Sequence, residues 1–126
     1  MTQKVSSLVG PSPESIRLRQ GKKTLSIKFQ GQPEFDLTAE FLRVESPSAE
    51  VQGHGASEKK IISGRKHVAI MEIEPVGNYA IRLIFDDLHD TGIYSWSYLF
   101  QLGRDHDQIW SHYLEELERG GLSRDP

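Results

Sequence analysis

Alternating apolar and polar side chains characterise the first part of the chain. Between residues 15 and 29 every second position is apolar, on both sides of a turn sequence at residues 20–23. A period of two predicts an antiparallel β-hairpin that buries one of its faces. The predicted buried side chains of this hairpin are Ile16, Leu18, Leu25, Ile27 and Phe29.

The next stretch combines a strand, a helical turn and a loop. A short strand is predicted around Phe35 and Leu37, followed by a helical turn over residues 38–43 that Thr38 caps. Residues 44–60 are rich in Ser, Pro, Gly and Glu and have few apolar side chains. They predict a long loop, and loops of that length are usually functional or disordered.

Two further strands follow the loop. They are predicted over residues 68–73 and 79–85, joined by a turn at residues 74–78. The second gives the strongest strand signal in the chain, because four apolar side chains alternate with smaller or polar ones. The predicted alternating residues are Tyr79, Ile81, Leu83 and Phe85.

The stretch DDLHDTGIYSW at residues 86–96 follows directly. Three aspartates flank His89, and Thr91 with Gly92 offers a turn. We expect a structural corner, in which Asp side chains bond backbone amides and the chain reverses. The residues expected to return to the core are Ile93, Tyr94 and Trp96. The other interpretation is a divalent-ion site, because imidazole and carboxylate groups both bind such ions.

The spacing changes to a helical period near the end of the chain. Over residues 105–119 one face is apolar and the other is acidic, and Gly120 with Gly121 ends the pattern. The apolar face comprises Ile109, Trp110, Tyr113, Leu114 and Leu117. The predicted fold class is therefore α+β: a small antiparallel β-sheet domain with a short helical turn near residues 38–43 and a C-terminal amphipathic helix.

The composition narrows the class of protein. The 126 residues are 37% hydrophobic and 26% charged with a net charge of −3, and no basic cluster occurs, so we expect a globular domain that binds no nucleic acid. No apolar run is long enough to span a membrane and the first residues resemble no signal peptide, so a cytoplasmic location is expected. The absence of cysteine excludes disulfides, thiolate metal sites and a cysteine nucleophile.

Three stretches together resemble a known family. They are, in chain order, PESIRLRQGKKTLSIKF (13–29), LRVESPSAEV (42–51) and VGNYAIRLIFDDLHDTGIYSW (76–96). They resemble the small domain at the N-terminus of gamma-butyrobetaine hydroxylase and its relatives, over residues 11–103. The predicted organisation is a flexible lead-in over residues 1–12, this domain over residues 13–103, and a C-terminal helix and tail over residues 104–126.

The resemblance also implies where zinc would be held. In the hydroxylase branch three cysteines, spaced Cys-x-Cys-x-x-Cys, and one histidine bind the ion. By position these ligands fall on Ser46, Ser48, Val51 and His89. Serine hydroxyls bind zinc far more weakly than thiolates and valine has no donor atom, so neither zinc nor another cofactor is expected. The residues left as candidate ligands for any ion are His89, Asp87, Glu50 and His54.

The aromatic residues late in the chain are candidates for a partner surface. An aromatic run with a period of two starts at Tyr94, and it fits either a platform for ligand stacking or core packing. The amphipathic helix likewise fits either docking on the sheet or contact with a partner. The candidate partner surface comprises Tyr94, Tyr98, Phe100 and Trp110.

Two classes of function compete. The first is a non-enzymatic accessory or protein-interaction domain with an unidentified protein partner, existing as a monomer or weak homodimer. Relatives fused to Mrp-type ATPases imply a link to iron–sulfur assembly, and the hydroxylase branch implies an oxygenase partner. The alternative is a small metal- or ligand-binding protein that uses His89 with carboxylates of the 44–58 loop. A hydrolase that acts through Asp87 and His89 is a third hypothesis.

Overall fold

The computed structural model of the chain describes residues 12–53 and 59–126. The candidate ligand His54 and all but the last residue of the predicted lead-in lie outside the described residues. The first antiparallel sheet consists of β1 (Pro13–Arg19), β2 (Thr24–Phe29) and β3 (Glu34–Thr38). The second consists of β4 (Ile70–Val76), β5 (Ala80–Phe85) and β6 (Gly92–Ser95). The helices are α2 (Ala39–Val44), α3 (Ala49–Gln52), α4 (Trp96–Arg104) and α5 (His106–Arg119).

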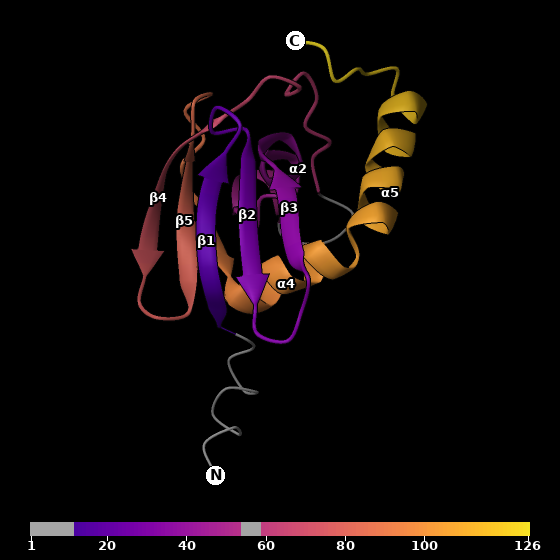
Figure 1. The fold of residues 1–126 in the computed structure, drawn as a ribbon. Helices are drawn as coiled ribbons and strands as arrows, with labels where there is room; N and C mark the ends of the chain where they lie inside the picture. The colour runs from indigo at the N-terminus through magenta and orange to yellow at the C-terminus, as the bar shows by residue number, and fades with distance from the viewer. Residues whose placement is uncertain (1–11, 54–58) are drawn as a thin grey trace.

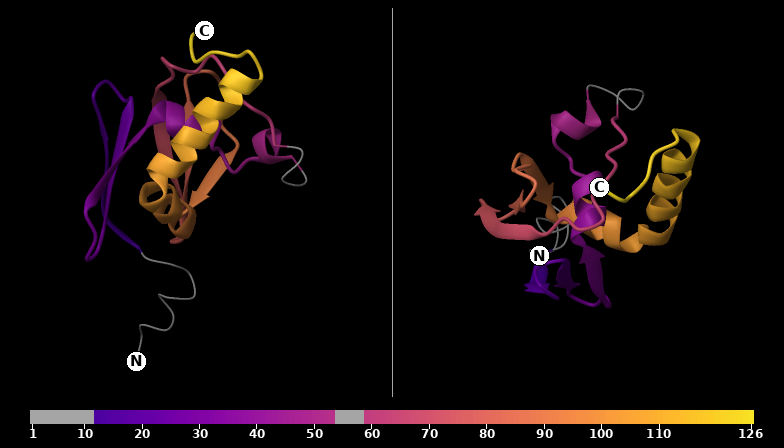
Figure 2. Two further views of the ribbon diagram at one scale, coloured as in Figure 1. Left: turned by 90° about the vertical axis from the view of Figure 1, so that its right-hand side faces the viewer. Right: turned by 90° about the horizontal axis from the view of Figure 1, so that it is seen from above.

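The two sheets share one core. The first sheet forms one side of the molecule, α4 crosses its lower end, and α5 runs along the side next to β3 (Figure 1). Seen from above, α2 lies between the first sheet and the rest of the molecule (Figure 2). Both sheets, α2 and α4 contribute fully buried side chains to the main core, among them Phe29, Leu42, Leu83 and Leu99. The predicted α+β class is confirmed, with the strands divided between two sheets.

The N-terminal hairpin is confirmed in its position, turn and buried face. Ile16 pairs with Ile27 and Leu18 with Leu25, and the turn occupies residues 20–23. The β2 side chains Leu25 and Ile27 are completely buried, whereas Ile16 and Leu18 are only half-buried. The difference arises because β1 is an edge strand and β2 is the central strand of the sheet.

The predicted helical turn is also confirmed. The α2 helix begins after Thr38, whose hydroxyl accepts a hydrogen bond from the backbone N–H of Phe41 at 3.1 Å. All six residues of α2 are buried, including the charged Glu40 and Arg43. Buried charges require partners, and these come from Arg124 for Glu40 and from Asp87 for Arg43.

The prediction of a structureless loop over residues 44–60 is wrong for the part that the structure describes. The α3 helix forms there, and the hydroxyl of Ser48 caps it by accepting a hydrogen bond from Glu50 N–H at 3.1 Å. Residues 44–46 and Val51 are buried. Four residues are too few to give a helical period, so the Ser cap was the only local signal for α3.

The predicted turn at residues 74–78 lies further along the chain. The β4 strand continues through Pro75 to Val76, and the turn occupies residues 77–79. Pro75 is tolerated because β4 is an edge strand, where a missing N–H breaks no pairing. As a consequence Tyr79 belongs to the turn and is 49% exposed, so it is not part of the buried alternation.

The aromatic run that begins at Tyr94 changes structure partway. Only Tyr94 and Ser95 of this run lie in β6, and α4 begins at Trp96. The Ser95 hydroxyl starts the helix by accepting a hydrogen bond from Tyr98 N–H at 3.1 Å. The sequence did not predict α4, because the alternation of aromatic and polar residues resembles a strand.

The C-terminal helix is confirmed as α5, and the segment after it is attached to the domain. Tyr113 and Leu117 are buried on α5, whereas Leu114 is 40% exposed. Beyond the helix, Ser123 and Arg124 accept backbone hydrogen bonds from Gly64 and Lys66 at 2.9 and 3.1 Å. Within residues 12–53 and 59–126, none of the helices combines the length and apolar character that crossing a membrane requires.

Candidate functional site

The polar corner at residues 86–96 reverses the chain between β5 and β6. The turn lies at residues 86–88, where Phe85 N–H donates to the His89 carbonyl at 3.0 Å and Leu88 has a φ of 76°. The prediction that Thr91 and Gly92 make the turn is wrong, since Gly92 already pairs within β6. Of the three residues expected to return to the core, only Tyr94 is fully buried. Trp96 is half-buried and Ile93 is 46% exposed.

His89 faces the segment that begins after α2, as predicted. Its side chain is 3% exposed, with Nε2 at 2.9 Å from the Ser46 hydroxyl and Nδ1 at 3.2 Å from a carboxylate oxygen of Glu50. Because an ionised carboxylate only accepts hydrogen bonds, we assign the ring hydrogen to Nδ1. Nε2 then accepts from the Ser46 hydroxyl, whose oxygen also accepts from Ser48 N–H at 3.2 Å.

Further hydrogen bonds join the same two segments. The hydroxyls of Ser48 and Thr91 lie 2.7 Å apart, and the side-chain amide of Gln52 donates to the Ser46 carbonyl at 2.8 Å. We call Ser46, Ser48, Glu50, His89 and Thr91 the serine–histidine clamp. It connects α3 with the corner between β5 and β6.

An ionic cluster supports the clamp from one side. A single oxygen of Asp87 accepts hydrogen bonds from the Nε atoms of Arg43 and Arg65, both at 2.7 Å, and its other oxygen accepts from His89 N–H at 3.1 Å. Burial alone would raise the pKa of Asp87, but these hydrogen bonds hold that pKa below its usual value. Burial and the guanidinium of Arg43 lower the pKa of His89 below 6.5, so its ring is neutral at pH 7.

The clamp does not fit a zinc ion. Ser46 and Ser48 offer neutral hydroxyls, and the buried Val51 has no donor atom. A dication here would also lie near the guanidinium of Arg43, whose Nη1 is buried without a hydrogen-bond partner among the described residues. Over residues 12–53 and 59–126, no group of three His, Asp or Glu side chains is arranged to hold a metal ion.

The clamp also has the connectivity of a serine hydrolase triad, from Ser46 through His89 to Glu50. Its position argues against catalysis, because Ser46 is completely buried and neither Ser46 nor His89 lines a cavity described below. A nucleophile has to reach its substrate. These contacts are those of a structural connection. Asp87, which the hydrolase hypothesis pairs with His89, forms ion pairs with two arginines.

The four aromatic residues predicted as a partner surface make hydrogen bonds or packing contacts within the domain, and Tyr98 also lines a cavity beside α4. Tyr94 is completely buried, and its hydroxyl donates to the Leu42 carbonyl at 2.5 Å. The half-buried Tyr98 donates to the Glu45 carbonyl at 2.5 Å. Phe100 packs edge-on against the core residue Phe29, with ring centroids 5.4 Å apart. Trp110 packs against Phe41, with centroids 6.0 Å apart.

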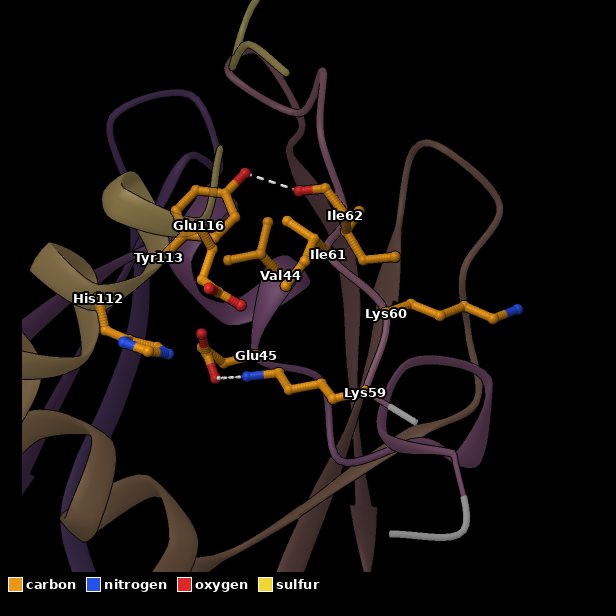
Figure 3. A pocket seen from close by; sticks show the side chains of 9 residues that line it. All are labelled: Val44, Glu45, Lys59, Lys60, Ile61, Ile62, His112, Tyr113 and Glu116. Carbon is orange, nitrogen blue, oxygen red and sulfur yellow. Dashed lines mark hydrogen bonds and ion pairs between the residues drawn. The ribbon is translucent and has the colours of Figure 1, made fainter. Parts of the chain in front are cut away.

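An open surface that could take a ligand lies away from the clamp, along α4 and α5. A cavity of about 340 Å³ lies between the end of α2, the irregular segment 59–62 and α5 (Figure 3). A second cavity of about 420 Å³ continues from it over α4. Both are lined by Glu45, Lys59 and His112, so they form one depression. We call it the α5 groove.

The α5 groove combines apolar walls with charged groups. Glu45 lies where the two cavities meet, with its side chain only 9% exposed and one carboxylate oxygen 2.7 Å from the ammonium of Lys59. Figure 3 shows the carboxylates of Glu45 and Glu116 pointing toward the same space, beside the ring of His112. The hydroxyl of Tyr113 instead donates to the Ile62 carbonyl at 2.6 Å, and burial raises the pKa of Tyr113 to about 12.

Sequence reasoning missed this groove. Its lining comes from the end of α2, segment 59–62, α4 and α5, and no local motif connects these four parts of the chain. The apolar face of the C-terminal helix was the available signal, since it packs on Val44, Ile61 and Ile62 and so brings the segments together.

Comparisons with known proteins place the chain in a family. Residues 16–100 match the family described as gamma-butyrobetaine hydroxylase-like, N-terminal. Two solution NMR structures are similar: one is 47% identical with a TM-score of 0.81, covering 92% of this chain and 91% of its own, and the other is 43% identical with a TM-score of 0.79, covering 93% and 87%. No curated protein matches.

A crystal structure from Acidithiobacillus ferrooxidans is also similar. It shows a protein of unknown function from the DUF971 family, 36% identical with a TM-score of 0.61, and the match covers 73% of this chain and 92% of that one. The family match spans more than half of the sequence and includes most of the β-hairpin and the whole polar corner. The chain therefore belongs to the gamma-butyrobetaine hydroxylase-like N-terminal domain family.

Proposed function

We propose that this chain is a non-enzymatic protein-interaction domain that binds its partner in the α5 groove. The observation that carries the proposal is the contrast between two places in the molecule. The clamp around His89 holds the catalytic residue types, but it is buried and already hydrogen-bonded. The α5 groove has apolar and charged groups together at an open surface, which is the composition of a binding site.

The size of the groove supports a protein segment as its ligand. Two connected cavities of about 340 and 420 Å³ offer room for several side chains in a row. The helices that line it are fixed by the core, since α4 buries Leu99 and Leu102 and α5 buries Tyr113 and Leu117. A preformed surface of this kind reduces the ordering cost of binding. The partner's link to iron–sulfur assembly or to an oxygenase remains part of this proposal.

Two neighbouring substitutions on α5 test the location of the binding site. His112 lines both cavities, and a His112→Trp variant places a large ring where they meet. Ser111 is exposed on the same helix and lines neither cavity, so Ser111→Trp is the matched control. Tagged wild-type and variant chains are incubated with an extract of the source cells, and the retained proteins are quantified.

We expect at least one protein of the extract to be retained equally by the wild type and by Ser111→Trp but not to be retained by His112→Trp. Melting curves of both variants confirm that each is folded. Equal retention of every captured protein by all three chains would contradict binding in the groove.

A further inference from the structure

The first cavity of the α5 groove has apolar side walls and a negatively charged end. Val44, Ile61 and Ile62 give it apolar sides, and the ring of Tyr113 packs in the same cluster. The carboxylates of Glu45 and Glu116 close the other side, as Figure 3 shows. A long apolar stem with a positive charge at its tip matches both parts, because such a side chain buries its methylene groups and keeps its charge next to carboxylates.

One lysine of the chain already occupies part of this site. The ammonium of Lys59 lies 2.7 Å from a carboxylate oxygen of Glu45, whose side chain is 9% exposed. A carboxylate buried to this extent needs a cation. The Lys59 side chain is 30% exposed, so it reaches Glu45 from the rim of the groove. Glu116 forms an ion pair with Arg119, whose side chain is 66% exposed.

We propose that this cavity accepts a lysine side chain of the partner protein, with its ammonium between Glu45 and Glu116 and with Lys59 displaced. The inference rests on the proposed function, since it names the partner chemistry for the same groove. An ammonium is a compact charge with three donors, so one group reaches two carboxylates at once. Lys59 shows that an ammonium fits against Glu45 in this environment.

A capped lysine, Nα-acetyl-lysine N-methylamide, is the probe for this site. We expect it to shift the backbone amide NMR signals of Ile61, Ile62 and Glu116, with a dissociation constant on the order of 1 mM for so small a ligand. Capped norleucine has the same stem without the charge, and we expect it to bind about tenfold more weakly or worse. Capped arginine distinguishes an ammonium site from a general cation site.

Three variants test which charged groups of the cavity affect the binding of capped lysine. Glu45→Gln removes the buried charge and should weaken binding of capped lysine about tenfold, which corresponds to a loss of one charge-assisted contact. Lys59→Met keeps the stem but removes the competing ammonium, so binding should become tighter. Glu118→Gln changes an exposed α5 carboxylate that does not line the cavity, and it should leave binding unchanged. Melting curves confirm that each variant is folded.

The proposal is overturned by any of three results: no shift in the cavity signals, equal binding of capped norleucine, or weaker binding by Lys59→Met. Failure of the lysine proposal can be distinguished from failure of the proposed function. If His112→Trp abolishes retention of a partner but capped lysine does not bind, the groove binds a partner without a lysine. If capped lysine binds through Glu45 but no protein depends on the groove, the cavity is a cation site and the proposed function fails.

Discussion

Gly92 of β6 lies directly against the hydroxyl of Ser46. A Cβ atom on Gly92 would lie 2.6 Å from Ser46 Oγ, closer than non-bonded atoms approach in proteins, and 3.0 Å from Cε1 of Tyr94. Glycine is required at position 92 because of this contact. Its backbone conformation does not require glycine, since its φ is not in the left-handed region. The absence of a side chain at Gly92 therefore allows Ser46 to reach His89.

We predict that Gly92→Ala destabilises the protein by about 1–3 kcal/mol, the usual cost of inserting a methyl group into a packed site. Ser46 and Tyr94 are both completely buried and cannot move into solvent. Urea unfolding followed by circular dichroism measures the change. Gly120→Ala is the control, because the atoms nearest to its Cβ lie at 3.5 Å and its φ is −90°. Equal midpoints for the two variants would contradict the close contact.

A second prediction concerns metal removal. The serine–histidine clamp connects α3 with the corner through hydrogen bonds, so the folded state should not depend on a bound ion. We expect the melting temperature to be the same before and after treatment with EDTA. A structural zinc ion would contribute several kcal/mol to folding, so a large fall in melting temperature on chelation would show that an ion holds these segments.

The strands that the sequence predicted best are those whose partner lies next to them in the chain. The hairpin around residues 20–23 was correct in its turn and buried face, because a period of two on both sides of a tight turn fixes which side chains share a face. The turn between β5 and β6 was harder to predict. The turn uses Leu88 with a positive φ, a conformation that apolar residues rarely adopt, while the more usual turn residues Thr91 and Gly92 lie outside it.

The candidate site was only partly predictable, for a related reason. The pairing of His89 with the segment at Ser46 came from the family resemblance, since 43 residues separate the two in sequence. No sequence pattern predicted that Glu45 is buried and paired with Lys59, because a charged residue after a helix usually faces solvent. Glu45 is buried, and its carbonyl accepts a hydrogen bond from Tyr98, which lies 53 residues further along the chain; such tertiary contacts leave no local trace.

A third prediction concerns pH. Burial and the guanidinium of Arg43 lower the folded-state pKa of His89 below 6.5, even though the carboxylates of Glu50 and Asp87 act in the opposite direction. The unfolded chain therefore binds a proton that the folded chain does not in the pH range between that folded pKa and 6.5. The stability contributed by neutral His89 is complete above pH 6.5 and is lost as the pH falls through the folded pKa.

Measurement of the unfolding free energy at a series of pH values tests this dependence. We expect wild-type stability to fall below pH 6.5, and His89→Gln to show a smaller slope in the same range. Asp87 also has a lowered pKa, so a further loss shared by both proteins should begin below pH 3.8. Identical slopes between neutral pH and pH 3.8 for wild type and His89→Gln would contradict a neutral buried imidazole.

The last prediction concerns the ion pair that attaches the C-terminal segment. Arg124 donates two hydrogen bonds to the carboxylate of Glu40, at 2.7 and 2.8 Å, and its guanidinium lies 5.4 Å from the ring centroid of Trp110. Glu40 is 5% exposed, so removal of Arg124 leaves a buried carboxylate without its cation. We expect Arg124→Ala to cost about 1–3 kcal/mol, less than a fully buried pair would, because the Arg124 side chain is 40% exposed. The double variant Glu40→Gln with Arg124→Ala should recover part of this loss, since it no longer buries a charge. If the double variant were less stable than Arg124→Ala by the full cost of a second independent substitution, the two residues would not act as a pair.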